Sequence, residues 1–207
     1  MDFDAVVAAV ERHLTLYVAE FARKRVFVHA GVVGWKDRAV LIPGQTMTGK
    51  STLVAALVQA GATYYSDEFA VIDSAGRIHP YPKPLQLRQE DGPTQSISLP
   101  VIGTKPLKVG LILSTRHRGG ASFRLREMSA GEAMLALLTN TVSAHRNPGQ
   151  ALRTLRKVLA GAKSLKGSRG EADPTVGELL RRNLMPVVPN HRAPLAQTVR
   201  LTGIQNR

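Results

Sequence analysis

The sequence predicts an α/β fold, and three observations lead to this expectation. The chain has 207 residues, a length that suits one domain with a small addition. Its hydrophobic fraction of 43% is that of an ordinary globular core. Strand-like and helix-like patterns alternate along the chain, and an apolar strand at 39–42 leads through a glycine-containing loop into a helical segment.

Three segments are predicted along the chain. Residues 1–24 form an N-terminal amphipathic helix, because apolar residues from Val6 to Phe21 recur at steps of three and four. Residues 25–183 form the main domain. Residues 184–207 form a basic, proline-containing tail, which has no hydrophobic period and is expected to have little structure of its own.

The main domain is predicted to contain both strands and helices. The strands are expected at 25–33, 39–42, 63–66, 69–73, 78–81, 85–88 and 107–115. The helices are expected at 49–60, after Ser129 with the capping-box spacing to Glu132, at 148–161 and at 174–183. Residues 121–127 alternate in polarity and are predicted to pair with 107–115, whereas 89–98 and 164–170 are predicted to be loops.

Composition excludes several classes of protein. The chain has no cysteine, which excludes a disulfide scaffold, thiol catalysis and Cys-ligated metal sites. No apolar run approaches the length of a membrane helix, so no membrane partner is expected. The first nine residues hold two Asp and no basic residue, which is unlike a signal peptide, and we therefore expect a cytoplasmic protein.

Positive charge is concentrated in the second half of the chain. Residues 1–111 hold 12 basic and 10 acidic residues, whereas residues 112–207 hold 16 basic and 5 acidic ones. The net charge of the whole chain is +13. One hypothesis is that the basic residues contact nucleic-acid phosphates, although aromatic residues for base stacking make up only 5% of the chain. The other is that they dock an acidic protein. The basic residues in question are Arg153, Arg156, Lys157, Lys163, Lys166, Arg169, Arg181 and Arg182.

A phosphate-binding loop is the most specific motif. Residues 44–51 fit the pattern G-x-x-x-x-G-K-[ST] between a predicted strand and a predicted helix. Backbone N–H groups of such a loop and the N-terminus of its helix point at phosphate oxygens. Lys50 places a cation on the β- and γ-phosphates, and the Ser51 hydroxyl ligates Mg²⁺. The predicted nucleotide-binding residues are Gly44, Gln45, Thr46, Met47, Thr48, Gly49, Lys50, Ser51 and Thr52.

An acidic pair, Asp67 and Glu68, follows the predicted strand 63–66. Chemistry in open α/β sheets gathers at the carboxyl ends of strands, which is where this pair stands. One carboxylate could hold the metal ion while its neighbour accepts a proton from a hydroxyl. The alternative is an ordinary solvated turn.

His29 interrupts an otherwise apolar strand, 25–33. A lone histidine in such a strand is more often a structural residue with satisfied hydrogen bonds than a catalytic one. From the residues alone, both interpretations of His29 stay open.

Taken together, these motifs resemble a known family. The residues that carry the resemblance are Val28-His29-Ala30-Gly31, the segment from Ala39 through Gly44 to Ser51, and Tyr65-Ser66-Asp67-Glu68. They are similar, in sequence and spacing, to the catalytic domain of HPr kinase/phosphorylase, whose core is shared with phosphoenolpyruvate carboxykinase. The resemblance covers about residues 25–140 and extends weakly to 183. It implies a P-loop kinase fold with a mixed central sheet and flanking helices, and it implies ATP and Mg²⁺ as cofactors.

The resemblance also implies roles for individual residues. Lys50 would bind phosphate, while Ser51 and Asp67 would hold the metal ion. Glu68 would accept the proton of the acceptor hydroxyl with Asp67 beside it, and His29 would stand near the transferred phosphate. The expected activity is ATP-dependent transfer of the γ-phosphate to a seryl or similar hydroxyl of a protein or peptide. A homo-oligomer is one assembly that the family suggests.

Two departures from the family pattern support an alternative. Gln86 stands near the position of a metal-binding glutamate, and neutral Gln is a poorer ligand for a hard cation. Residues 102–108 carry lysines where the family has an arginine, and a lysine does not reproduce a bidentate fork. The alternative is a nucleotide-binding regulatory module without turnover, and a third interpretation is a nucleic-acid-binding NTPase.

Overall fold

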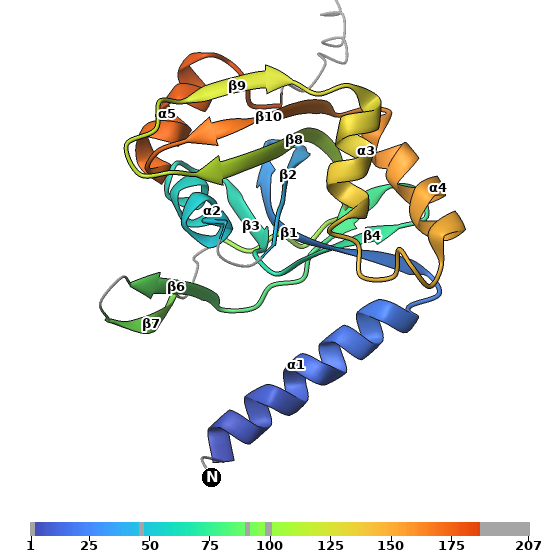
Figure 1. The fold of residues 1–207 in the computed structure, drawn as a ribbon. Coiled ribbons are helices and arrows are strands. Elements are labelled where there is room, and N and C mark those ends of the chain that lie inside the picture. Colours follow the sequence, from blue (N-terminus) through green and yellow to red (C-terminus); the bar gives the residue numbers. More distant parts are fainter. Residues whose placement is uncertain (1–2, 46–47, 90–91, 98–100, 187–207) are drawn as a thin grey trace, which may run out of the picture.

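The protein is a mixed α/β structure in which four of the five helices described flank an eight-stranded sheet (Figure 1). The computed structural model describes residues 3–45, 48–89, 92–97 and 101–186. The helices are α1 (Phe3–Phe21), α2 (Lys50–Gln59), α3 (Ala130–Leu138), α4 (Pro148–Leu159) and α5 (Ala172–Arg181). The strands are β1 (Arg25–Trp35), β2 (Arg38–Pro43), β3 (Thr63–Ser66), β4 (Phe69–Asp73), β5 (Arg77–His79), β6 (Leu85–Gln89), β7 (Gly92–Ile97), β8 (Leu107–His117), β9 (Arg124–Glu127) and β10 (Lys163–Arg169).

Strand β1 organises the sheet. Its second half pairs antiparallel with β2 through a tight turn at Lys36, which has a φ of 53°. On its other side, β1 pairs first with β4 and then with β3. Strand β2 also pairs in parallel with β8, and β5 pairs with both β4 and β8. Five strands, β1, β2, β8, β5 and β4, therefore close into a ring.

Two hydrophobic cores form because successive side chains of a strand point to opposite faces. Ile42 and Leu113 pack in a core with buried side chains of α2 and α5. Their chain neighbours Leu41 and Ile112 pack in a second core with buried side chains of α3 and α4. Helices of the two pairs thus cover the two sides of the strands.

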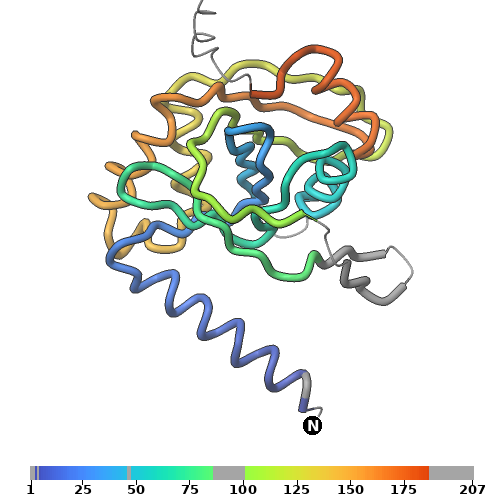
Figure 2. Tube along the Cα trace, turned by 180° about the vertical axis from the view of Figure 1, so that it is seen from behind, coloured from blue at the N-terminus to red at the C-terminus, as the bar shows by residue number. Residues whose placement is uncertain are grey.

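Helix α1 stands away from this body in both views (Figures 1 and 2). The predicted helix at 1–24 is observed as Phe3–Phe21, and most of its large apolar side chains are exposed, Phe3 by 78% and Leu14 by 61%. Ala19 is the side chain of α1 that is fully buried, against Phe27 and Phe69. No helix in the described ranges is long and apolar enough to cross a membrane.

Three sequence expectations about the strands are wrong. Residues 164–170, predicted to be a loop, belong largely to strand β10, which pairs in parallel with β8. Strand β9 pairs with β10 and not with β8, because β10 lies between them. Residues 92–97, also predicted to be a loop, form β7, which pairs with β6 in a separate two-stranded sheet. The capping box of α3 is confirmed, with Ser129 and Glu132 bonded reciprocally.

Candidate functional site

The predicted phosphate loop joins the end of β2 to the start of α2. Gly49 has a φ of +77°, a left-handed conformation that favours glycine and turns the chain into α2. The Thr48 hydroxyl donates to the Gln45 carbonyl at 2.9 Å, and this bond closes the loop on itself. Thr46 and Met47 of the predicted nucleotide-binding set lie outside the described residues, and Thr52 is exposed on α2.

Lys50 is the first residue of α2, and its side chain folds back over the loop. Its Nζ donates to the Gln45 carbonyl at 2.6 Å. Burial lowers the pKa of Lys50, and the charge of Asp67 opposes that shift. Lys50 therefore holds an ammonium above the loop, with a backbone carbonyl as its partner.

The middle of β1 brings the predicted site residues together. The Gly44 N–H donates to the His29 carbonyl at 3.2 Å, and the Ala30 N–H donates to the Glu68 carbonyl at 3.2 Å. The register of β1 shifts between Val32 and Val33, where its partner strand β3 ends and Asp67-Glu68 follow. Consecutive residues of one strand therefore fix the loop on one side and the acidic pair on the other.

Asp67 lies on the inner side of the acidic pair. Burial raises the pKa of its carboxyl group, and Glu68 adds to this, while Ser51, Tyr64 and Lys50 oppose it. The Tyr64 hydroxyl is 3.4 Å from Asp67 Oδ1 and donates to the Lys83 carbonyl at 2.8 Å. Because burial raises the pKa of Tyr64 as well, this hydroxyl stays protonated. The surroundings of Asp67 thus combine an ammonium with two hydroxyl groups.

Glu68 is partly exposed. Its carboxylate pairs with Lys83, with Nζ 3.0 Å from Oε2, and its side chain is 34% exposed. Its own N–H donates to the Ser66 hydroxyl at 3.2 Å, and this bond fixes the turn after β3. Lys83 was not expected at the site from the sequence, because it lies in a proline-rich stretch without a motif.

His29 is half-buried beside the loop lysine and the acidic pair. Its ring lies against Phe69, with the ring centroids 4.5 Å apart. Burial lowers its pKa, Lys50 lowers it further and Glu68 opposes both. Burial and the neighbouring ammonium therefore favour the neutral imidazole over the protonated one.

Arg169 is a second site residue that the motifs did not reveal. It ends β10 and is only 1% exposed. Its Nη2 donates to the Gly49 carbonyl at 2.7 Å and its Nη1 donates to the Gly170 carbonyl at 3.0 Å. A side chain on Gly49 would collide with this guanidinium, since an added Cβ would lie 2.7 Å from Nη2. The missed signal was the strand itself, because 164–170 was expected to be a loop.

All these groups meet at one edge of the sheet. Strands β2, β3, β8 and β10 run in the same direction, so that their carboxyl ends lie at the same edge. The phosphate loop follows β2, the acidic pair follows β3 and Arg169 ends β10. This is the edge at which α/β sheets generally bind ligands.

A divalent cation would find few protein ligands here. Within the described ranges, no group of three or more His, Asp or Glu side chains could hold a metal ion. Ser51 and Asp67 supply one hydroxyl and one carboxylate. Mg²⁺ typically takes one or two carboxylates together with substrate phosphates and water, so this small donor set fits a nucleotide-bound Mg²⁺.

No family model matches the chain, and no curated protein matches it. Among solved structures, the chain is similar to one described as the Hpr(Ser) kinase/phosphatase from Coxiella burnetii, with 17% sequence identity and a TM-score of 0.39. The match covers 76% of this chain and 95% of that one. It is a distant structural similarity and assigns no activity to this chain.

Proposed function

We propose that this protein is an ATP-dependent kinase that phosphorylates a hydroxyl group of a protein or peptide. Residues 25–183 would form the catalytic domain. The observation that supports the proposal best is the arrangement around β1, which holds the loop with Lys50 on one side and Asp67-Glu68 on the other. A phosphate cradle facing a carboxylate pair is what phosphoryl transfer to an alcohol requires.

The loop and α2 would bind the phosphates of ATP. The first N–H groups of α2, which have no partner within an α-helix, and the positive N-terminal end of that helix favour anions. Lys50 would exchange the Gln45 carbonyl for β- and γ-phosphate oxygens, which gain more from the ammonium because they are charged. Arg169 would keep the Gly49 carbonyl turned away from the phosphates.

Ser51 and Asp67 would hold Mg²⁺, which when bound neutralises charge on the β- and γ-phosphates. The lysine beside them favours the ionised form of Asp67, against the effect of burial. This form is the one that ligates a hard cation.

Glu68 would accept the proton of the acceptor hydroxyl. The hydroxyl oxygen forms a bond to the γ-phosphorus, the bond from that phosphorus to the β–γ bridging oxygen breaks, and ADP leaves. The hydroxyl proton passes to a Glu68 carboxylate oxygen. Glu68 suits this role because it is partly exposed, so that an acceptor could reach it.

Two variants test this proposal with γ-labelled ATP and a mixed library of Ser-, Thr- and Tyr-containing peptides. Lys50→Ala should weaken Mg-ATP binding by at least about tenfold, as expected for the loss of a charge-assisted phosphate contact. Glu68→Gln should bind Mg-ATP as the unmodified protein does and transfer label about 10²–10⁴-fold more slowly. Glu127→Gln, an exposed change on β9, is the matched control. Unchanged transfer by Glu68→Gln would contradict the proposal.

One observation favours a second candidate, a nucleotide-binding regulatory module without turnover. Lys83 pairs with a Glu68 carboxylate oxygen in the structure, so an acceptor hydroxyl would first have to displace this ammonium. This candidate expects tight Mg-ATP binding with no transfer to any peptide. It also expects that Lys83→Met, which releases Glu68, leaves transfer absent.

A further inference from the structure

The sheet carries a basic groove on the face opposite α2 and α5. Its lining residues belong to β8, β9, β10 and α3 and to the segments that adjoin α3. Figure 1 shows how these elements are arranged. Its volume is about 740 Å³. It takes no part in the proposed phosphoryl transfer, since none of the loop or carboxylate residues lines it.

The strand register sets the groove's basic residues in two rows. Lys166 of β10 is paired with Ser114 of β8 on one side and with Arg126 of β9 on the other. Two residues further along, Ser168 is paired with Arg116 and Arg124 in the same way. Residues two apart on a strand share a face. Four cationic side chains and two serines therefore lie on one surface of three strands.

The cations of the two rows differ in their partners. Arg126 and Lys166 both bind Glu132 of α3, at 2.8 and 2.7 Å. Arg116 and Arg124 are exposed and form no ion pair within the described part of the chain. The row that contains Arg116 and Arg124 thus carries positive charge that no described carboxylate compensates.

The wall made by α3 is partly apolar. Leu135 is 62% exposed, and Met128 and Ala136 line the groove near it. An occupant that pairs only with the cations would leave this apolar strip against water. The surface therefore suits a ligand that carries both carboxylates and apolar side chains.

We infer that this groove docks an acidic, partly apolar segment of a partner protein. Its charge is complementary to carboxylates, which steer association and fix orientation. No aromatic side chain is among the residues that line it, so the aromatic platforms on which single-stranded nucleic acids stack their bases are not found in the groove. Arg116 and Ser168 adjoin His117 and Arg169, so the groove begins at the same sheet edge as the phosphate loop.

Fluorescence anisotropy with a labelled peptide rich in Glu and containing Leu tests the inference without any nucleotide. The double variant Arg116→Glu/Arg124→Glu should weaken binding by at least about tenfold, because it replaces attraction by repulsion. The matched control, Arg153→Glu/Arg156→Glu on α4, changes the net charge equally at exposed positions outside the groove and should change affinity by less than about twofold.

A second pair of measurements tests the apolar wall. Leu135→Ala should weaken binding of the Leu-containing peptide and leave a peptide with Ser in place of Leu unaffected. Arg116→Gln/Arg124→Gln removes the positive charges without introducing negative ones and should weaken binding less than the Glu variant does. Equal losses in the α4 control, or tighter binding of a single-stranded RNA than of the peptide, would overturn the inference. Neither result would affect the proposed kinase activity.

Discussion

At the scale of single residues, Arg169 stands out because it carries a charge into the interior. It is 1% exposed, its Nε has no hydrogen-bond partner among the described residues, and its two bonds go to backbone carbonyls. Burial lowers its pKa, which reflects the cost of keeping the guanidinium away from water. The charge of Glu171 opposes this shift, but Arg169 forms no ion pair within the described residues, so the cost of its burial is only partly offset.

We predict that Arg169→Met lowers the affinity for nucleotide without lowering the stability of the fold. The free energy of unfolding should stay within about 1 kcal/mol of its original value or rise, because an apolar side chain replaces a costly charge. Mg-ATP affinity should fall by about tenfold, because the Gly49 carbonyl loses the hydrogen bond from Arg169 that holds the loop in its conformation. Urea unfolding and calorimetric titration measure the two effects. A large loss of stability with unchanged affinity would show that Arg169 only supports the fold.

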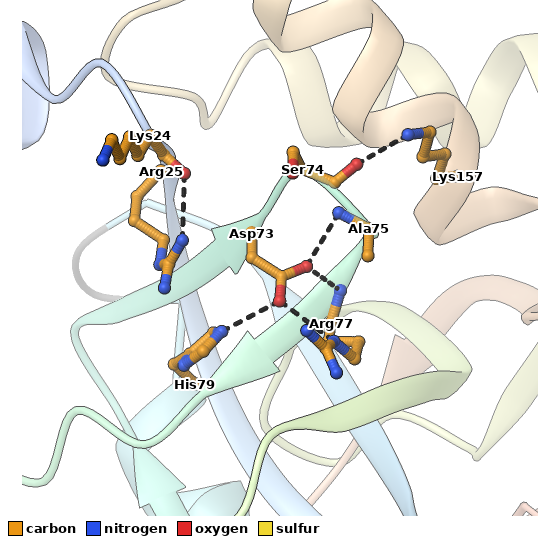
Figure 3. A network of polar contacts seen from close by, with 8 residues as sticks. All are labelled: Lys24, Arg25, Asp73, Ser74, Ala75, Arg77, His79 and Lys157. Carbon is orange, nitrogen blue, oxygen red and sulfur yellow. Dashed lines mark hydrogen bonds and ion pairs between the residues drawn. The ribbon is translucent and has the colours of Figure 1, made fainter.

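Asp73 is a second buried charge, but it is fully paired (Figure 3). Its carboxylate accepts hydrogen bonds from the N–H groups of Ala75 and Arg77, from Arg77 Nε and from His79 Nε2, at 2.9–3.0 Å. Burial acts to raise its pKa, and these bonds outweigh burial and hold the pKa well below its usual range. The carboxylate thereby fixes the turn between β4 and β5.

The stability of the protein should therefore depend on Asp73 at neutral pH. Because the folded pKa lies below the unfolded one, the stabilisation is complete above about pH 4 and is lost as the pH falls further. Asp73→Asn should lower the free energy of unfolding by about 1–3 kcal/mol at pH 7. Urea unfolding should show this difference shrinking as the solution is acidified below pH 4, and a constant difference would contradict the prediction.

At the scale of elements, the close approach of α2 to β1 depends on Gly31. A Cβ on Gly31 would lie 2.6 Å from Cγ2 of Val54, whereas its next neighbour would be 3.8 Å away on Ile42. The absence of a side chain on the strand lets α2 pack directly over it. Since the phosphate loop leads into α2, this contact also sets where the loop lies.

We predict that Gly31→Ala destabilises the protein by about 1–3 kcal/mol, as overpacking in cores does. Val54→Ala removes the methyl group that would clash, and alone it should also destabilise. In the double variant the two losses should be less than additive, by at least about 0.5 kcal/mol, because they share one contact. Chemical unfolding of the four proteins gives this coupling directly, and strict additivity would refute the argument.

Elements with a strong local pattern were predictable from the sequence. The bounds of β3 and β4 follow from short runs of apolar and aromatic residues, and the capping box of α3 follows from a single spacing. Strand β10 was not predictable in this way. Its residues Lys163–Arg169 are mostly polar and include Gly167, a pattern that is typical of a loop. It is a strand because β8 and β9 supply hydrogen bonds on both sides. Parallel pairing between distant segments leaves no mark in the local sequence.

Because pairing between distant segments leaves no local signal, the sequence predicts some residues of the site and not others. Lys50, Asp67, Glu68 and His29 belong to motifs, and the structure brings them together around β1. Their roles in catalysis are still predictions. Arg169 comes from a segment more than a hundred residues away, through a strand that was not anticipated, and so no spacing pointed to it.

At the scale of the whole molecule, the closed ring of strands belongs to a well-packed body, whereas helix α1 and the β6–β7 pair are attached to that body by few contacts. Val32, Leu41 and Ile112 belong to ring strands and are 0% exposed. Outside the ring, α1 buries Ala19 alone, and β6 pairs only with β7 within the described residues. Two-stranded sheets are marginally stable alone, and a helix with its apolar side chains in water gains little from packing.

The opening free energies measured by native-state hydrogen exchange should therefore differ among these parts. Amides of β1, β2 and β8 should exchange only through global unfolding, with opening free energies of about 5–15 kcal/mol. Amides of α1 should open at a cost below about 2 kcal/mol, because opening that helix exposes almost no additional apolar surface. The β6–β7 pair should fall between them, since Leu85 is buried in the core against α2. Protection of α1 equal to that of β1 would contradict this ranking, because it would require a partner that covers the helix in solution.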